Sequence, residues 1–150
     1  MKRGILYLAV LSLMMLYPTE RTDLGKLKPV ETVMICVEHG RVVLKTDTED
    51  RGSGATPQLA LRDMKEKSSG VIYMDTADYL LVGEGAEHWI TGLRGLLKGK
   101  MRICMAEKAV DIRHAGSFLS VHKPKLTMET WTPEAKQQIL TAVDGELKLN

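Results

Sequence analysis

The feature that most constrains this chain is a short apolar segment at its N-terminus. Lys2 and Arg3 precede an uncharged run from Ile5 to Tyr17, which ends at Pro18. A basic start followed by an apolar run is typical of a secretory signal. We therefore predict that residues 1–17 are a signal or membrane-anchor segment, which leaves about 130 of the 150 residues to form a domain.

The sequence leaves the fate of this segment open between cleavage and anchoring. The run is shorter than the roughly 20 residues of a transmembrane helix, yet bulky residues occupy 13–17, where signal cleavage requires small ones. No Cys follows the run, so a lipid anchor has no attachment site. A buried core helix is the alternative, but the basic residues precede the run instead of lining one helical face.

Charge and aromatic content argue against nucleic acid as a partner. The chain has 21 basic and 19 acidic residues, and Lys2 with Arg3 supplies the whole excess. A domain without net basic charge lacks the electrostatic footprint of a nucleic-acid-binding protein. One Phe and two Trp also leave few rings on which single-stranded bases could stack.

The rest of the chain is predicted to be a tether, residues 18–29, and a single domain, residues 30–150. The tether is polar and lacks a periodic apolar face. From Val30 to Thr48, two alternating apolar stretches flank His39-Gly40, which predicts a β-hairpin. The polar, Gly-rich stretch from Thr46 to Gly54 then predicts a loop.

Helix and strand patterns alternate after this loop. Thr56-Pro57 predicts a helix start, with Thr as the N-cap, and Ser68-Ser69-Gly70 predicts its end. The apolar runs Val71–Met74 and Tyr79–Val82 predict strands on either side of a polar loop. Apolar residues at helical spacing predict a second helix from Trp89 to Leu97.

The C-terminal third continues the alternation. Met101–Ala106 is predicted to be a strand, and Asp111 to cap a helix that stops near Pro124. Trp131-Thr132-Pro133 predicts the start of a last, more polar helix that includes Val143. The predicted order is ββαββαβα plus a terminal helix, an α+β fold with a small mixed sheet and helices packed on it.

The two cysteines, Cys36 and Cys104, lie in apolar stretches that are typical of strands. Two buried free thiols are the simplest interpretation. A disulfide would stabilise the domain by about 2–4 kcal/mol, but it needs the two Cα atoms within about 7 Å. Without flanking His residues the pair does not form a zinc motif, and we predict neither a metal site nor a cofactor.

Catalytic motifs are missing from the sequence. Gly52-Ser53-Gly54 does not follow a strand directly as a nucleophile elbow does, and Pro57 stands at the third Gly position of the dinucleotide fingerprint. No two of the four histidines pair at a spacing of four residues: His39, His88, His114 and His122. We therefore predict that the protein is not an enzyme.

Two loops and one aromatic residue are the predicted partner contacts. Asp75 and Asp78 flank a polar loop, where turn-forming roles fit better than a shared proton or a bound cation. Trp131 lies beside a predicted helix start, as either a lid over the core or an exposed contact. The predicted contact residues are Asp75, Thr76, Asp78, Gly83, Gly85 and Trp131.

Several positions between Gly52 and Pro124 follow the order of a known family. They are Gly52 and Gly54 before a helix with Ala60-Leu61, then Ile72-Tyr73, then Leu80-Leu81-Val82-Gly83-Glu84, and Arg102 on a strand ending at Ala106. In these positions the chain resembles the first domain of the Ger(x)C family of spore germination proteins. The family is typically made of lipoproteins with further domains, whereas this chain has no Cys after its apolar segment and has Thr76-Ala77 in place of a frequent Ser-His pair.

The resemblance implies a non-catalytic protein of an endospore-forming bacterium that contacts germination or sporulation complexes. Our leading hypothesis is an exported, membrane-proximal interaction module that binds protein partners and meets the membrane through residues 5–17. Its expected location is extracytoplasmic, membrane-associated or secreted, with the spore membrane implied by the family. The alternatives are a secreted ligand-binding or inhibitor domain with a groove near Trp131, and a hydrolase whose His and Asp residues assemble in space.

Overall fold

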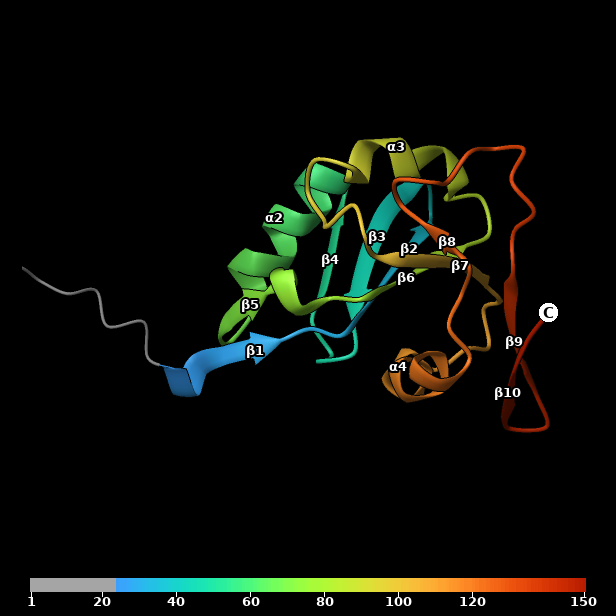
Figure 1. Cartoon of the computed structure of the whole chain (residues 1–150). Helices are drawn as coiled ribbons and strands as arrows, with labels where there is room; N and C mark the ends of the chain where they lie inside the picture. The colour runs from blue at the N-terminus through green and yellow to red at the C-terminus, as the bar shows by residue number, and fades with distance from the viewer. Residues whose placement is uncertain (1–23) are drawn as a thin grey trace, which may run out of the picture.

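A computed structural model of the chain describes residues 24–150, so the predicted segment 1–17 and residues 18–23 of the predicted tether lie outside the described residues. Figure 1 shows its helices and strands. The helices are α2 (Pro57–Lys67), α3 (Ile90–Leu93) and α4 (Ile112–Val121), with short 3-10 turns at Leu24–Lys26, Met74–Thr76 and Glu87–Trp89. The strands are β1 (Leu27–Pro29), β2 (Thr32–Glu38), β3 (Arg41–Thr46), β4 (Arg51–Gly54), β5 (Val71–Tyr73), β6 (Tyr79–Gly83), β7 (Arg102–Ala106), β8 (Leu126–Thr127), β9 (Ile139–Val143) and β10 (Glu146–Leu149).

The main sheet has eight strands, in the order β10-β9-β7-β6-β2-β3-β4, with β8 beside β7. Its centre is parallel, because β2, β6, β7 and β9 pair in parallel, whereas β3, β4 and β10 add antiparallel edges. Strands β1 and β5 form a separate two-stranded parallel ribbon. The structure thus confirms a mixed α+β fold.

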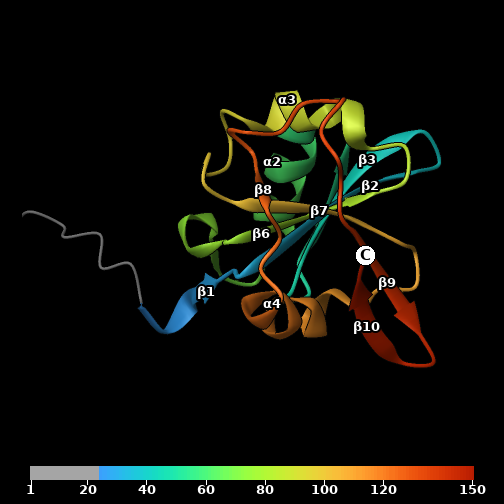
Figure 2. The same ribbon diagram turned by 45° about the vertical axis from the view of Figure 1, so that its right-hand side comes forward.

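Helices cover both faces of the sheet (Figure 2). Helices α2 and α3 pack on one face, and α4 packs on the other. The first core combines Ile35 and Leu80 from the sheet with Met64 of α2. The second joins Leu81 and Leu140 to the buried side chains of α4. Each central strand therefore buries alternate residues on opposite sides, which explains its continuous apolar character.

The predicted first hairpin and the predicted helices at α2 and α4 are confirmed. Strands β2 and β3 meet at His39-Gly40, and both residues have positive φ, 51° and 74°, as a tight hairpin turn requires. The hydroxyl of Thr56 accepts a hydrogen bond from the N–H of Leu59 at 3.4 Å, and Asp111 caps α4 in the same way at Arg113. Both helix starts follow from capping chemistry.

The predicted loop from Thr46 to Gly54 is wrong at its end, because Arg51–Gly54 form the edge strand β4. Its glycines allow α2 to lie directly on the strand. A Cβ added at Gly52 would meet the carbonyl oxygen of Ala60 at 2.1 Å, and one at Gly54 would meet the N–H nitrogen of Ala60 at 2.6 Å. The Gly-rich composition therefore reflects close helix packing instead of a loop.

The predicted terminal helix after Trp131 is also wrong. Residues 139–149 form the hairpin β9–β10, with Asp144-Gly145 at its turn in positive φ, 52° and 83°. Asp-Gly between alternating apolar residues is a strong hairpin signal, which the sequence interpretation missed. The predicted second helix is shorter than expected, because only Ile90–Leu93 are α-helical before a stretch that contains Gly95.

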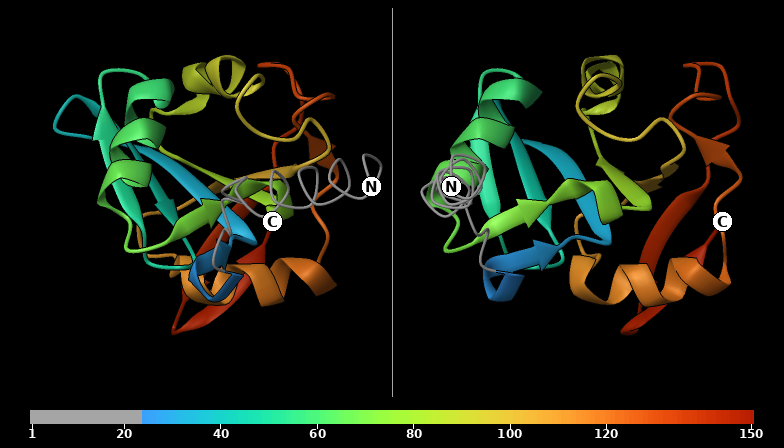
Figure 3. Two further views of the ribbon diagram at one scale, coloured as in Figure 1. Left: turned by 90° about the vertical axis from the view of Figure 1, so that its left-hand side faces the viewer. Right: turned by 60° about the vertical axis from the view of Figure 1, so that its left-hand side comes forward.

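The last residues of the predicted tether belong to the folded structure. Leu27–Pro29 form β1 and pair in parallel with β5, beside the end of α2 (Figure 3). The predicted strand at 71–74 is thus present as β5, but it lies outside the main sheet. No helix among residues 24–150 has the length and apolar character needed to cross a bilayer.

Both cysteines are free thiols, as the simplest interpretation predicted, although Cys36 is only half-buried. They lie on β2 and β7, which are separated by β6. Cα atoms two strands apart are on the order of 10 Å apart, beyond the reach of about 7 Å for a disulfide. Burial raises the pKa of Cys104 to about 12, so this thiol is not an activated nucleophile.

Candidate functional site

The two predicted contact loops lie at opposite ends of β6. The loop with Asp75, Thr76 and Asp78 precedes the strand, and the loop with Gly83 and Gly85 follows it. The structure therefore does not bring them together into one site. Asp75, Thr76, Asp78 and Gly85 are exposed, whereas Gly83 and Trp131 are buried.

Two of these residues, Gly83 and Trp131, are buried in the folded domain. Gly83 is the last residue of β6, and a Cβ added there would come within 2.9 Å of the Cβ of Cys36. Trp131 is 5% exposed and packs in the first core, where its carbonyl accepts a 2.7 Å hydrogen bond from Arg94. Of the two interpretations of Trp131, the structure matches the lid over the core.

The Asp75–Asp78 loop serves the local backbone. The hydroxyl of Thr76 donates to the carbonyls of Val30 at 2.8 Å and Tyr73 at 2.9 Å, which fastens β5 to the start of β2. Asp78 forms an exposed ion pair with Lys98 at 3.6 Å. Within residues 24–150 there is no group of three or more potential metal-binding His, Cys, Asp or Glu side chains.

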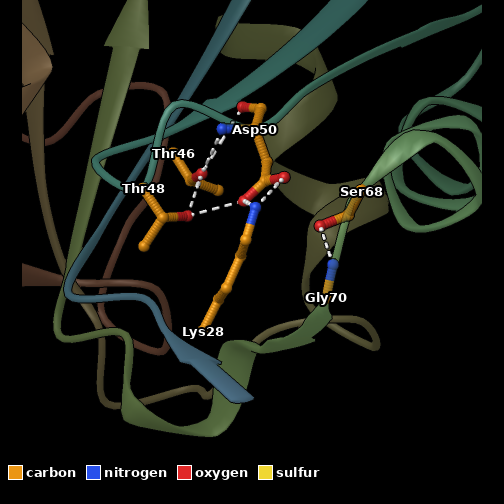
Figure 4. Close-up of polar contacts among 6 residues, drawn as sticks. All are labelled: Lys28, Thr46, Thr48, Asp50, Ser68 and Gly70. Atoms are coloured by element: carbon orange, nitrogen blue, oxygen red, sulfur yellow. Dashed lines mark hydrogen bonds and ion pairs between the residues drawn. The ribbon is translucent and has the colours of Figure 1, made fainter. Parts of the chain in front are cut away.

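A buried carboxylate, Asp50, fastens β1 to the main sheet (Figure 4). Lys28 of β1 donates to its two oxygens at 3.0 and 3.3 Å, and Thr48 donates to one of them at 2.8 Å. The N–H of Asp50 donates to the hydroxyl of Thr46 at 3.2 Å. We call these four residues, Lys28, Thr46, Thr48 and Asp50, the clamp.

The clamp holds Asp50 in its charged form. Burial alone would raise the pKa of Asp50, but the nearby hydroxyl of Ser68 and the donors Lys28 and Thr48 together hold its pKa below the ordinary value. Because the Asp50 side chain is only 7% exposed, its charge depends on these donors instead of water. The clamp is thus a structural fastening of the N-terminal strand.

The ribbon of β1 and β5 has an inverted distribution of side chains. On its inner face Lys28 reaches Asp50, and Ile72 enters the first core. The outer face of the ribbon carries aliphatic and aromatic side chains and no charged ones: Leu27, Pro29, Val71 and Tyr73. Val71 is 50% and Tyr73 45% exposed. Sequence reasoning missed this face, because β1 becomes a strand only through pairing with β5 far along the chain.

Two of the surface hollows formed by residues 24–150 lie elsewhere, and Trp131 lines neither of these two. One, of about 270 Å³, runs between β4 and α2 and is lined by Arg41, Ser53, Gly54, Ala55, Leu59, Arg62, Asp63 and Glu66. There Asp63 accepts a 2.9 Å hydrogen bond from the N–H of Ser53 and so occupies a backbone donor at the sheet edge.

The second hollow, of about 210 Å³, lies at the start of α4 and is lined by Lys45, Thr46, Glu49, Asp50, Arg51, Ile112 and Arg113. Its cations already have acidic partners. Lys45 and Arg51 both pair with Glu38, and Arg113 pairs with Asp111 and Glu49. The hollow therefore does not offer an unpaired positive charge to an anionic ligand.

All four histidines are exposed. Nδ1 of His114 lies 3.2 Å from Oδ2 of Asp111. This pair lies on the open surface at the start of α4, where Asp111 is the N-cap of the helix. The residues that line the two hollows include no histidine. The geometry of residues 24–150 therefore offers no observation that favours the hydrolase alternative.

Comparison with known protein families, with curated proteins and with solved structures found no match. The resemblance of residues 52–124 to the Ger(x)C domain thus stays a prediction.

Proposed function

We propose that this protein is an exported, membrane-proximal, non-catalytic interaction module. The observation that carries the proposal is the short connection between the apolar run and the folded structure. Only residues 18–26 separate Tyr17 from β1, and the clamp holds β1 to the main sheet. Nine residues would span at most about 30 Å even if all were extended, and Leu24–Lys26 form a 3-10 turn, so an anchored run would keep the domain close to the bilayer.

The exposed part of the predicted contact set offers the partner surface. Asp75, Thr76 and Asp78 lie at one end of β6, and Glu84 with Gly85 lies at the other. A Cβ added at Gly85 would meet nothing within 4 Å, which marks an open surface. The resemblance to the Ger(x)C domain supports a partner in a germination or sporulation complex of an endospore-forming bacterium.

Site-specific photo-crosslinking in intact cells and spores tests this proposal. A photoreactive amino acid is placed at Asp75 or at Glu84, with Ser120 on the exposed side of α4 as the matched control position. We expect a crosslink to one membrane protein from at least one loop and none from Ser120. A substitution to Lys at the crosslinking loop position is expected to abolish co-purification of that protein.

Two results would contradict the proposal. Recovery of the uncrosslinked protein from all positions would remove the interaction role. Recovery of a shortened, soluble protein from the medium would favour the secreted ligand-binding or inhibitor domain, for which the hollow beside α2 is a candidate groove.

A further inference from the structure

The β1–β5 ribbon places its charged residue inside and its apolar residues outside. In an antiparallel or edge strand with one wet face, the outward side chains are normally polar. Here Lys28 points inward to Asp50, while Val71 and Tyr73 remain about half exposed. A paired charge inside and apolar side chains outside reverse the usual arrangement, which makes the outer face of the ribbon a candidate contact surface.

The connection to the N-terminal segment indicates what this face contacts. Among the described residues β1 is the first strand, so the ribbon lies where the described part of the chain begins (Figure 3). The backbone N–H of Val30 donates a 3.2 Å hydrogen bond to the carbonyl oxygen of Tyr73. This bond and the clamp hold β1 in the folded domain, so β1 does not lengthen the flexible connection. A bilayer that anchors the apolar run would therefore be the surface nearest to the outer face of the ribbon.

The side chains of the ribbon suit a lipid surface. Tyrosine is enriched at membrane–water interfaces, where its ring lies among the headgroups and its hydroxyl stays in water. Lys26 precedes β1, and Lys65 lies on the last turn of α2, just before β5, whereas Lys67 on the same turn pairs with Asp63 at 2.8 Å. Lysines beside an apolar face add attraction to anionic headgroups. Asp75 lies beyond the other end of β5.

We propose that the outer face of the ribbon docks onto the lipid headgroup boundary and fixes the orientation of the domain on the membrane. This inference rests on the proposed membrane anchoring. The opposite end of the molecule, with β9 and β10, then points away from the bilayer, because Figure 1 shows these strands far from the ribbon.

Quenching of an added tryptophan by brominated lipids tests this docking. Full-length protein carrying Tyr73→Trp is reconstituted into phosphatidylcholine–phosphatidylglycerol vesicles whose acyl chains are brominated near the headgroup. Val143→Trp is the matched control, since Val143 of β9 is 44% exposed and Tyr73 45%. Trp89 and Trp131 contribute equally to both variants, and circular dichroism checks that each folds.

We expect the brominated lipid to remove most of the emission that Trp at position 73 adds, and none that Trp at position 143 adds. Vesicle-bound protein without quenching at position 73 would overturn the docking and leave anchoring intact. Blue-shifted but unquenched emission would also overturn it, because protein would then cover the face. Protein that does not associate with vesicles would contradict the proposed function itself.

Discussion

Asp50 is a carboxylate whose charge is stabilised inside the protein by hydrogen-bond donors. Replacing it with Asn keeps its shape but leaves the ammonium group of Lys28 without its counter-charge. We expect Asp50→Asn to lower the free energy of unfolding at neutral pH by about 1–3 kcal/mol, measured by urea denaturation. Asp144→Asn is the matched control, because Asp144 is exposed in a turn that favours Asn.

The effect of Asp50→Asn should depend on pH. The folded pKa of Asp50 lies below its unfolded value of about 3.9, so its stabilising contribution is present above that pH. The contribution is lost as the pH falls through the folded pKa. We therefore expect the unfolding free energies of the unchanged protein and the Asp50→Asn variant to converge below about pH 4. A constant difference between pH 7 and pH 3 would contradict the charged clamp.

Substitution of Trp131 tests whether its side chain belongs to the core or to a contact surface. Because its side chain is buried in the first core, Trp131→Ala should lower the free energy of unfolding by about 3–5 kcal/mol. Thermal and urea denaturation of the isolated protein measure this loss. An unchanged stability would mean that Trp131 is instead an exposed partner contact.

At the scale of elements, close contact between α2 and β4 depends on glycine. Gly52→Ala would place a methyl group against the backbone of Ala60, which cannot move without displacing the helix. We expect a loss of about 3 kcal/mol or failure to fold, seen by circular dichroism and urea denaturation. Gly95→Ala is the control, because nothing lies within 4 Å of an added Cβ there, and its stability should be unchanged or slightly higher.

The β9–β10 hairpin and the helix that the sequence interpretation placed there predict opposite effects of Gly145→Ala on stability. Gly145 has φ of 83°, so Gly145→Ala should cost about 1–2 kcal/mol. In a helix the same substitution would raise stability. Urea denaturation with far-ultraviolet circular dichroism separates these cases, and a more stable, more helical variant would show that the hairpin is wrong.

Local chemistry explains which elements were predictable. The caps Thr56 and Asp111 and the turn at His39-Gly40 act within a few residues, so the sequence shows them directly. Strands β1 and β4 depend on partners elsewhere in the chain, and their Pro and Gly residues resemble loops when read alone. The β9–β10 hairpin was predictable from Asp144-Gly145, but the preceding Thr132-Pro133 resembles a helix start.

The candidate site was less predictable than the fold. The loops at Asp75–Asp78 and Gly83–Gly85 are close in sequence, yet β6 separates them in space. The outer face of the ribbon depends on the parallel pairing of β1 with β5, and local composition gives no sign of that pairing. A surface made by two distant segments is visible only once the chain is folded.

At the scale of the whole molecule, the first described residues, from Leu24 on, and the apolar ribbon lie together at one end. The β9–β10 hairpin lies at the other end (Figure 1). A domain built in this way would present one end to the membrane and the other to the surrounding compartment. Membrane attachment is therefore the claim on which both the proposed function and the lipid docking depend.

The most direct test is fractionation of cells and spores, combined with the intact mass of the recovered protein. The account predicts that the protein in the membrane fraction resists carbonate washing and has a mass that includes residues 1–17, because the apolar run stays attached to the domain. A shortened protein in the medium or in the soluble fraction would contradict membrane attachment.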